Sequence, residues 1–310
     1  MAPVRQTVTV IVPHYEALDD LDRCLSALER QTYPRERIAI VVADNASPCG
    51  LGAVESAVAG RAQVVEVTTR GAAAARNGAI DHATGEILAF TDSDCIPCPA
   101  WLEQGVAALD QYDLVGGRMV VSAADEANVS ATEAFEKIFA FDNAAYVAKK
   151  HFSVTANLFC RRDHFRLVGP FRAEVSEDRD WCLRARAAGL RIGYAAGAIV
   201  VHPGRRDWPE LQTKLSRLNR ETLAWYSQAG FGRARWLLRS LLLPASAVVH
   251  TPKVVFTRRL STVREKAGAL RILYRSRWWR FGHALAIAFK PDLPGASKGP
   301  KRVGMENRGI

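Results

Sequence analysis

The sequence is poor in cysteine, and its six cysteines are scattered along 310 residues rather than clustered. This distribution is not the pattern of a disulfide framework, so we interpret them as reduced cytosolic thiols. Cys95 and Cys98 form a lone C-x-x-C with no second pair and no nearby histidine. This isolation disfavours a zinc or redox site.

Long apolar runs are also missing. The first residues enter a strand-like segment without an apolar signal stretch, so we expect no export and place the chain in the cytoplasm. The run from Leu241 to Val249 lies between Arg239 and Lys253 and is too short to span a bilayer. It suits a core, re-entrant or interfacial segment. No internal repeat is visible.

Acidic residues are scarce in the last third of the chain. Of the 42 Lys and Arg, 22 lie from Arg205 onward, together with only 6 of the 32 Asp and Glu. The first 204 residues therefore carry 20 basic and 26 acidic side chains. We expect the acidic front to hold a divalent cation and the basic rear to meet an anionic surface. No nucleic-acid-binding motif is present, and the acidic front argues against nucleic acid as a partner.

Apolar segments of two kinds alternate in the first hundred residues. The runs at 8–13, 38–43, 64–67 and 87–91 are typical of buried strands. Leucines at spacings of three and four between 18 and 28, and an alanine-rich stretch at 72–83, are typical of helices. This alternation predicts an α/β fold, in which helices cover both faces of a mostly parallel sheet.

The rest of the chain is less regular. We predict strands at 114–121, 154–160 and 192–201, and helices at 132–146 and 178–188. After Arg205 the composition shifts to Arg, Trp and Leu. We therefore predict an α/β domain at 1–204, a basic amphipathic helical region at 205–290 and a tail rich in Gly, Pro and Lys at 291–310.

Three carboxylates follow predicted strands. Asp44 ends the second strand, and Asp92 and Asp94 come directly after the run at 87–91. Ligands bind beyond the carboxyl ends of such strands. Two carboxylates one residue apart on a turn can approach one Mg²⁺ or Mn²⁺ ion, whose other sites then take phosphate oxygens and water. The alternative is a solvated acidic turn. Asp44 is either a turn residue or a hydrogen-bond acceptor for a bound base or ribose.

Two further sites have chemical potential. Glu177 and Asp178 open a predicted helix, where a carboxylate either caps the free N–H groups or acts as a general base toward an acceptor hydroxyl. His202 ends a β-branched strand, and its imidazole either completes a metal site or is structural.

Six stretches carry a resemblance to a known family. They are residues 8–13 (VTVIVP), 31–34 (QTYP), 41–47 (VVADNAS), 74–78 (AARNG), 83–94 (ATGEILAFTDSD) and 176–184 (SEDRDWCLR). In this order and spacing, which cover roughly residues 7 to 203, they resemble the family 2 glycosyltransferases, inverting enzymes of the GT-A fold. The last third matches no motif of that family.

The resemblance implies a division of labour among the residues named above. Asp178 would be the catalytic base, with Glu177 beside it, and Asp94 the main ligand of a Mn²⁺ or Mg²⁺ ion, with Asp92 and His202 as further metal contacts. The implied contacts of the nucleotide sugar are Pro13, Tyr15, Asp44, Arg76, Asp92, Ser93 and Asn157.

The implied function is inverting transfer of a sugar from a nucleotide-sugar donor, with UDP as the preferred nucleotide, to the hydroxyl of a glycan or lipid-linked acceptor, in polysaccharide or glycolipid assembly. One alternative is a nucleotidyltransferase. It is disfavoured because the loop Pro13 to Glu16 lacks the Gly and Lys or Arg such enzymes place there. A second alternative is a catalytically silent, membrane-associated assembly factor. The intact Asp92, Asp94, Asp178 and His202 argue against it.

The basic rear contains an amphipathic pattern. Apolar residues from Val263 to Phe289 recur at spacings of three and four, and seven arginines between 258 and 280 surround them. Their stripe consists of Val263, Ala267, Leu270, Tyr274, Trp278, Phe281, Leu285 and Phe289. We expect this helix to lie on an anionic membrane surface, at the cytoplasmic face. The alternative is that the stripe packs on the α/β domain.

Overall fold

The computed structural model describes residues 5–173, 176–227 and 232–288. The predicted Phe289 and the tail at 291–310 lie outside the described residues. The strands are β1 (Val8–His14), β2 (Ile38–Asp44), β3 (Gln63–Glu66), β4 (Ile87–Phe90), β5 (Ile96–Pro97), β6 (Leu114–Ser122), β7 (Leu158–Arg161) and β8 (Ile192–Pro203).

The helices fall into an N-terminal and a C-terminal group. The first comprises α1 (Leu18–Glu29), α2 (Leu51–Val58), α3 (Ala72–Asp81), α4 (Trp101–Ala108), α5 (Ala131–Phe139), α6 (Asn143–Ala145), α7 (Arg162–Val168) and α8 (Glu177–Ala187). The second comprises α9 (Trp208–Ser227), α10 (Gly232–Leu241), α11 (Leu243–Val255) and α12 (Val263–Ala288).

The strands form one mixed sheet. Its order is β3-β2-β1-β4-β7-β6-β8-β5. The first four strands in this order are parallel, β7 runs antiparallel to β4 and β6, and β8 runs parallel to β6. Each face has its own apolar core, because α1, α2 and α4 pack on one side and α3, α7 and α8 on the other. The predicted α/β architecture, with helices on both faces, is confirmed.

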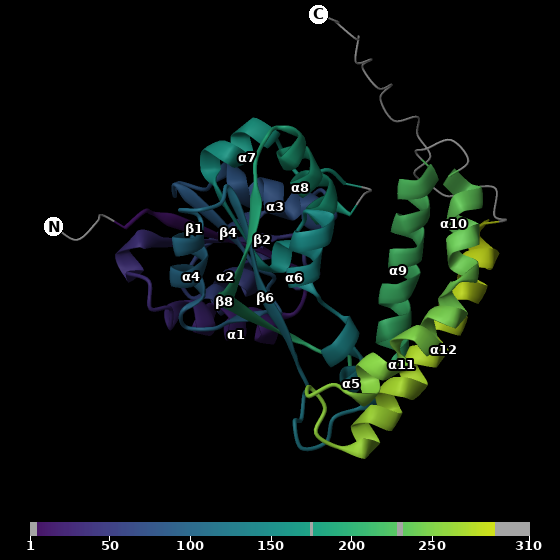
Figure 1. The fold of residues 1–310 in the computed structure, drawn as a ribbon. Coiled ribbons are helices and arrows are strands. Elements are labelled where there is room, and N and C mark those ends of the chain that lie inside the picture. Colours follow the sequence, from purple (N-terminus) through teal and green to yellow (C-terminus); the bar gives the residue numbers. More distant parts are fainter. Residues whose placement is uncertain (1–4, 174–175, 228–231, 289–310) are drawn as a thin grey trace, which may run out of the picture.

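The strands β6 and β8 extend beyond the sheet to the C-terminal helices (Figure 1). Their register shifts between Gly117 and Arg118, where β8 contains three residues more than β6. A side chain at Gly117 would collide with the amide group of Asn157 and with the carbonyl oxygen of Ala198. Only glycine therefore allows the strands to approach this closely beside the irregularity.

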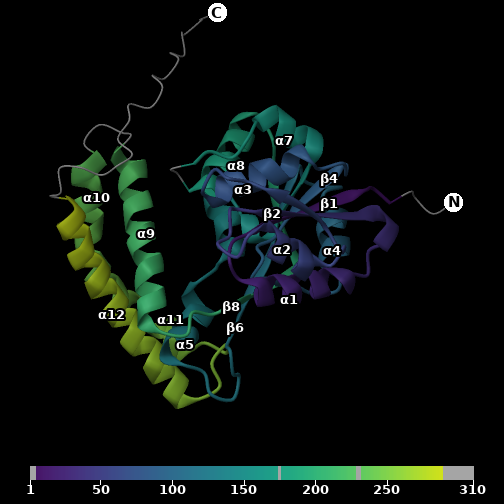
Figure 2. The ribbon, with the colours of Figure 1, turned by 180° about the vertical axis from the view of Figure 1, so that it is seen from behind.

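The C-terminal helices lie beside the sheet region in both views (Figures 1 and 2). Residues of α5, α9, α11 and α12 share one apolar core, so α5 packs with these helices although it precedes residue 205. A capping box fixes the start of α5, since Ser130 accepts a hydrogen bond from the Glu133 backbone and the Glu133 side chain accepts one from the Ser130 backbone.

Two predictions about the middle of the chain are wrong in detail. The helix expected at 132–146 ends at Phe139, and a new short helix begins after Asp142, whose side chain accepts a hydrogen bond from the Ala145 backbone. The strand expected at 154–160 begins only at Leu158, because Thr155–Asn157 form a 3₁₀ turn.

The predicted stripe on α12 coincides only in part with the side on which that helix packs, since Leu270 lies against the helical core but other members are exposed. The buried residues of α12 are Gly268, Ala269, Ile272, Leu273, Ser276, Ala284 and Ile287. Val263, Tyr274 and Trp278 are exposed, with Trp278 at 59%. The alternative prediction, that this stripe packs on the α/β domain, is therefore wrong for these three residues. Small residues fill the contact instead: a side chain at Gly268 would touch Ala131 of α5.

Candidate active site

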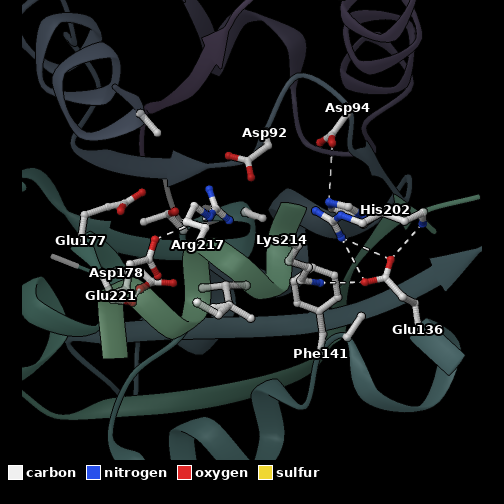
Figure 3. A pocket seen from close by; sticks show the side chains of 18 of the residues that line it. Asp92, Asp94, Glu136, Phe141, Glu177, Asp178, His202, Lys214, Arg217 and Glu221 are labelled. Carbon is white, nitrogen blue, oxygen red and sulfur yellow. Dashed lines mark hydrogen bonds and ion pairs between the residues drawn. The ribbon is translucent and has the colours of Figure 1, made fainter. Parts of the chain in front are cut away.

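A cleft of about 720 Å³ separates the sheet region from the C-terminal helices. One wall consists of the segments that follow β1 and β4 and the start of α8, where the carboxyl ends of parallel strands meet. The other wall comes from α5, α9 and α12. In Figure 3, side chains from both walls face the same space.

The acidic turn after β4 forms one end of the cleft. Ligand atoms of Asp92, Asp94 and Cys95 lie within 4.8 Å of one another, and the His202 Nε2 atom lies 3.5 Å from the Asp94 Oδ2 atom. The Nδ1 atom of His202 lies 2.7 Å from the Pro203 carbonyl oxygen, which only accepts. Nδ1 therefore carries a proton, and Nε2 is the ring nitrogen that faces the Asp94 carboxylate.

This donor set suits a hard divalent cation. Two carboxylates and a neutral imidazole nitrogen are ligands of Mn²⁺ and Mg²⁺ sites. Burial raises the pKa of Asp94 against the opposing effect of His202, as expected for a carboxylate that lacks a full counter-charge. Cys95 is different, because burial and the neighbouring carboxylates raise the pKa of its thiol well above the usual value. Its thiol is therefore protonated while no ion is bound, and a hard cation prefers the carboxylate oxygens to sulfur.

Arg76 of α3 ties the acidic turn to the start of α8. It donates hydrogen bonds to Asp92 Oδ1 at 2.6 Å and to Glu177 Oε1 at 2.8 Å. Burial works to lower the pKa of this guanidinium, but the two carboxylates hold it above its usual value. Arg76 therefore stays charged and fixes the spacing between the two acidic segments. Its Nε atom is buried without a hydrogen-bond partner in the described part of the chain.

Asp178 lies half-buried in the first turn of α8 and lines the cleft. The Ser176 hydroxyl and the Arg179 backbone N–H both donate to its Oδ1 atom, at 2.7 and 2.6 Å. Burial nevertheless raises the pKa of Asp178, with Glu177 adding to the rise. A carboxylate with a raised pKa is a better proton acceptor than an ordinary aspartate, and hydrogen bonds to one oxygen fix its orientation.

The predicted nucleotide-sugar contacts divide into two groups. Pro13, Tyr15, Arg76, Asp92 and Ser93 all line the cleft. The other two predicted contacts, Asp44 and Asn157, do not line it.

In the structure, the polar groups of Asp44 and Asn157 are hydrogen-bonded within the protein. Both oxygens of Asp44 accept hydrogen bonds from Ser47, one from its hydroxyl and one from its backbone N–H, and Asp44 is buried. Asn157 is buried and accepts from Trp101 Nε1 at 2.9 Å. Its amide nitrogen donates to the carbonyl oxygens of Arg118 and Ala198, so it stabilises the register shift between β6 and β8.

The helical wall supplies residues that the sequence reasoning missed. Glu136 of α5 is buried and accepts hydrogen bonds from the Arg205 guanidinium and backbone and from Lys214 Nζ at 2.8 Å. Burial works to raise the pKa of Glu136, but Lys214 and Arg205 hold it below its usual value. This network joins α5 to α9 at the end of the cleft that holds His202 (Figure 3).

A pair of charged residues on α9, Arg217 and Glu221, lies near Asp178. The Arg217 Nε atom is 3.5 Å from Glu221 Oε1, and burial raises the pKa of Glu221, with Glu177 and Asp178 adding to the rise. Lys214, Arg217 and Glu221 recur at helical spacing on one side of α9. A search for that spacing next to the basic residues would have indicated a shared face, although not its position over the cleft.

His14, at the end of β1, also lines the cleft. Its ring is buried, and neither nitrogen has a hydrogen-bond partner in the described residues. Burial lowers the pKa of this imidazole, which keeps it neutral. The sequence analysis included His14 in the loop from Pro13 to Glu16 but predicted no role for it.

Comparison with known proteins bears on these findings. The model of the family described as glycosyl transferase family 2 matches residues 9–169, about half of the chain. The chain belongs to glycosyl transferase family 2. The match includes the acidic turn after β4 and ends before α8.

Relatives extend this membership. Over 221 residues the chain is 33% identical to the glycosyltransferase AglE of Haloferax volcanii, covering 69% of this chain and 72% of that protein. It is 29% identical to the pre-mycofactocin glycosyltransferase of Mycobacterium tuberculosis over 66% of this chain, but this match spans only 45% of that protein.

A solved structure covers almost all of the chain. The mannosyltransferase PcManGT of Pyrobaculum calidifontis, in complex with GDP-Man and Mn²⁺, is 25% identical and superposes with a TM-score of 0.60. The superposition covers 92% of this chain and 86% of that one. The family 2 chain is thus a glycosyl-transfer enzyme with the GT-A fold. Among its described residues, no helix has the length and apolar content needed to cross a membrane.

Proposed function

We propose that this family 2 enzyme transfers a sugar from a nucleotide-sugar donor to an acceptor hydroxyl with inversion at the anomeric carbon. One observation carries the proposal: Asp92, Asp94 and His202, a donor set for a divalent cation, line the same cleft as Asp178, a carboxylate with a raised pKa. A leaving diphosphate needs the first group, and an attacking hydroxyl needs the second.

Asp94, Asp92 and His202 are the residues that would hold Mn²⁺ or Mg²⁺. The structural neighbour, which was solved with Mn²⁺, supports this choice of cation. A cation bound there supplies positive charge to a departing diphosphate. The protein itself fixes the site, because Arg76 restrains Asp92 and the Pro203 carbonyl fixes the tautomer of His202.

The chemical step needs a single displacement. Asp178 takes the proton from the acceptor hydroxyl while the hydroxyl oxygen forms a bond to the anomeric carbon. The bond from that carbon to the diphosphate oxygen breaks, and its electron pair leaves with the nucleoside diphosphate. Attack and departure on opposite faces of the sugar invert the anomeric configuration. Positioning and charge stabilisation supply most of the acceleration.

UDP-sugars and GDP-sugars are the first donors to examine. The resemblance noted above favours UDP, while the structural neighbour binds GDP-Man. Pro13, Tyr15 and Ser93 line the cleft where the donor would bind. His14 is placed between them with two unpartnered ring nitrogens, so we add it to the proposed donor contacts.

The acceptor is proposed to be a glycan or lipid-linked glycan, used at the cytoplasmic face of a membrane. The support lies on the outer face of α10 and α11. Leu242, Val249 and Phe256 recur every seven residues there, and Val249 and Phe256 are 75% and 81% exposed. Arg258, Arg259 and Lys253 lie at the same end of α11 and are also exposed. Apolar side chains next to cations suit the headgroup layer of an anionic bilayer.

Donor hydrolysis tests the proposal. A panel of UDP-, GDP- and dTDP-sugars is incubated with Mn²⁺ or Mg²⁺, with membrane extract as a source of acceptors, and nucleoside diphosphate release is measured. We expect turnover of one donor class that stops on chelation of the metal. Asp94→Ala should remove the metal dependence, and Asp178→Asn should lower kcat by about 10²–10⁴.

Asp81→Asn is the matched control, since Asp81 is exposed on α3 and does not line the cleft. It should keep wild-type rates. Should the wild type turn over and bind no donor, the proposed reaction is wrong, and a silent assembly factor becomes the better description.

A further inference from the structure

Beyond Asp178, the cleft is lined by cations without counter-ions. Arg277 and Arg280 of α12 and Lys150, which precedes β7, all line the cleft. Within the described parts of the chain, none of the three lies within ion-pair distance of a carboxylate. Arg205 and Lys214 differ, because both are bound to Glu136 at the end of the cleft that holds His202.

The two arginines are held in place rather than free in solvent. The Arg280 Nε atom donates to Asn219 Oδ1 at 3.0 Å, and the Asn219 amide donates back to the Arg280 carbonyl at 3.1 Å. Asn219 is itself buried. The Nε atom of Arg277 is buried, and no described atom accepts a hydrogen bond from it. One guanidinium is thus pre-positioned, and the other has an unused donor.

The electrostatics of this group are unfavourable without a ligand. Burial lowers the pKa of Arg280 to about 10, with Arg277 and Arg239 adding to the effect. Burial also lowers the pKa of Arg277 and of Lys150, and Arg239 again contributes to each. Cations that are partly withdrawn from water and close to one another destabilise the structure, unless an anion binds among them.

This basic group lies on the side of the cleft that holds the base. Arg179, next to Asp178 in the chain, is close enough to lower the pKa of Lys150. In the proposed reaction the acceptor hydroxyl must contact Asp178, whereas the donor diphosphate is placed at Asp94 and His202. A molecule that contacts Asp178 therefore extends toward the cations of α12.

We infer that Lys150, Arg277 and Arg280 form a subsite for a phosphate ester on the acceptor. The acceptor would then carry a phosphate or diphosphate close to the hydroxyl that receives the sugar. This inference rests on the proposed function. Guanidinium groups fit phosphate oxygens in paired hydrogen bonds, and lysine adds a point charge, so the three residue types suit this ligand.

Binding of simple phosphates tests the inference without any donor. Octyl phosphate, octyl glucoside and inorganic phosphate are titrated, below their micelle concentrations, into the full-length wild type, Arg277→Gln, Arg280→Gln and Arg271→Gln. The last is the matched control, because Arg271 is exposed on α12 and does not line the cleft. We expect octyl phosphate to bind the wild type and the control equally. Its Kd should rise about tenfold or more in the other two variants.

Comparison of inorganic phosphate with octyl phosphate shows whether the subsite recognises a free phosphate or a lipid phosphate. If inorganic phosphate binds as tightly as octyl phosphate, the subsite recognises the phosphate group alone. If octyl phosphate binds more tightly, the chain also contributes and the ligand is a lipid phosphate. Failure of octyl phosphate to bind the wild type, or equal binding to all four proteins, would overturn the inference. Arg277→Lys guards against misfolding, since it keeps the charge and should retain part of the affinity.

A donor titration distinguishes the inference from its rival. With Mn²⁺ present, the Kd of the active nucleotide sugar should change less than twofold in Arg277→Gln. An equal loss of donor affinity would mean that the arginines bind the donor diphosphate, and the inference would be wrong. If no donor is turned over but octyl phosphate still depends on the arginines, the proposed function fails and the anion subsite stands.

Discussion

The two walls of the cleft are built differently. On the sheet wall, the acidic residues follow strand ends or open a helix, so backbone geometry sets their positions. On the helical wall, side chains reach the cleft at helical spacing, as Lys214, Arg217 and Glu221 do on α9. The sheet wall supplies the groups proposed for metal binding and proton transfer. The helical wall supplies charges that surround whatever occupies the cleft.

This difference has an energetic side. The sheet wall pairs part of its charge internally, since Arg76 joins Asp92 to Glu177, whereas burial raises the pKa values of Asp94 and Asp178. The helical wall has one satisfied network around Glu136 and a separate group of cations around Arg277 and Arg280. A wall with compensated charges is rigid when empty, whereas a wall with uncompensated charges is stabilised by its ligand.

The largest expected effect comes from breaking the Glu136 network within the helical wall. In Glu136→Gln, Lys214 and Arg205 lose a buried partner, so the free energy of unfolding should fall by about 3–5 kcal/mol. Urea unfolding of both proteins at pH 7 measures this loss in the free energy of unfolding. Glu126→Gln is the control, because Glu126 is the solvent-exposed partner of Lys137, and ion pairs with an exposed member contribute about 0–1 kcal/mol.

The same carboxylate predicts a pH dependence. The pKa of Glu136 is lowered in the folded state, so its contribution is present above the usual glutamate pKa and is lost as pH falls through the folded value. The wild type should therefore lose stability on acidification more steeply than Glu136→Gln. Parallel curves would show that Glu136 does not fasten α5 to α9.

A second comparison concerns the two sides of α12. Leu273 is fully buried against the helical core, whereas Trp278 is mostly exposed. Leu273→Ala should lower the free energy of unfolding by about 2–5 kcal/mol, and Trp278→Ala by less than about 1 kcal/mol. Thermal and urea unfolding of both variants measure the difference. The reverse order would restore the stripe expected from the sequence as the packing face.

A third experiment tests whether the outer face of α10 and α11 meets a bilayer. The double variant Val249→Asp, Phe256→Asp places two charges on that face. We expect binding to vesicles of phosphatidylcholine with phosphatidylglycerol to fall by about tenfold or more, with secondary structure unchanged. Leu167→Asp, at an exposed position on α7, is the control. If wild-type protein does not sediment with anionic vesicles, the membrane proposal fails.

The smallest effect should be a gain in stability. The pKa of Asp178 is raised in the folded state, so its ionisation destabilises the fold. The contribution of the protonated Asp178 to folding stability is present at low pH. It is lost as pH rises through the unfolded and then the folded pKa of this carboxyl group. Asp178→Asn should thus raise Tm by a few degrees at pH 7 and not at pH 3. A lower Tm at pH 7 would indicate that the carboxylate is well compensated.

The sequence predicted the sheet wall well, for a physical reason. Continuous apolar runs indicate buried strands, and the residues that follow parallel strands lie at the same edge of the sheet. Asp92, Asp94 and Asp178 could therefore be predicted from local sequence patterns. For Asp44 and Asn157 the residue type and position fit a ligand contact, while only the three-dimensional structure shows that Ser47 and the carbonyls near Gly117 already contact their polar groups.

The helical wall could not be predicted in the same way. On α12 both Trp278 and Leu273 are apolar, and hydrophobicity alone does not say which one finds a partner surface. Small residues decide it, since Gly268 and Ala269 let α12 approach α5. The closeness of Glu136 to Lys214, 78 positions along the chain, depends on that packing and leaves no local trace in the sequence.

The register shift between β6 and β8 has a consequence for changes in chain length. The shift places His202 opposite Val121, whereas a continuous ladder from the Gly117–Ala195 pair would place Ile199 there. Deletion of the three extra residues, Ala196 to Ala198, would leave His202 opposite Val121 but would remove the Ala198 carbonyl to which Asn157 donates. A change of chain length near Gly197 therefore keeps the imidazole beside Asp94 only if the irregularity changes by the same number of residues.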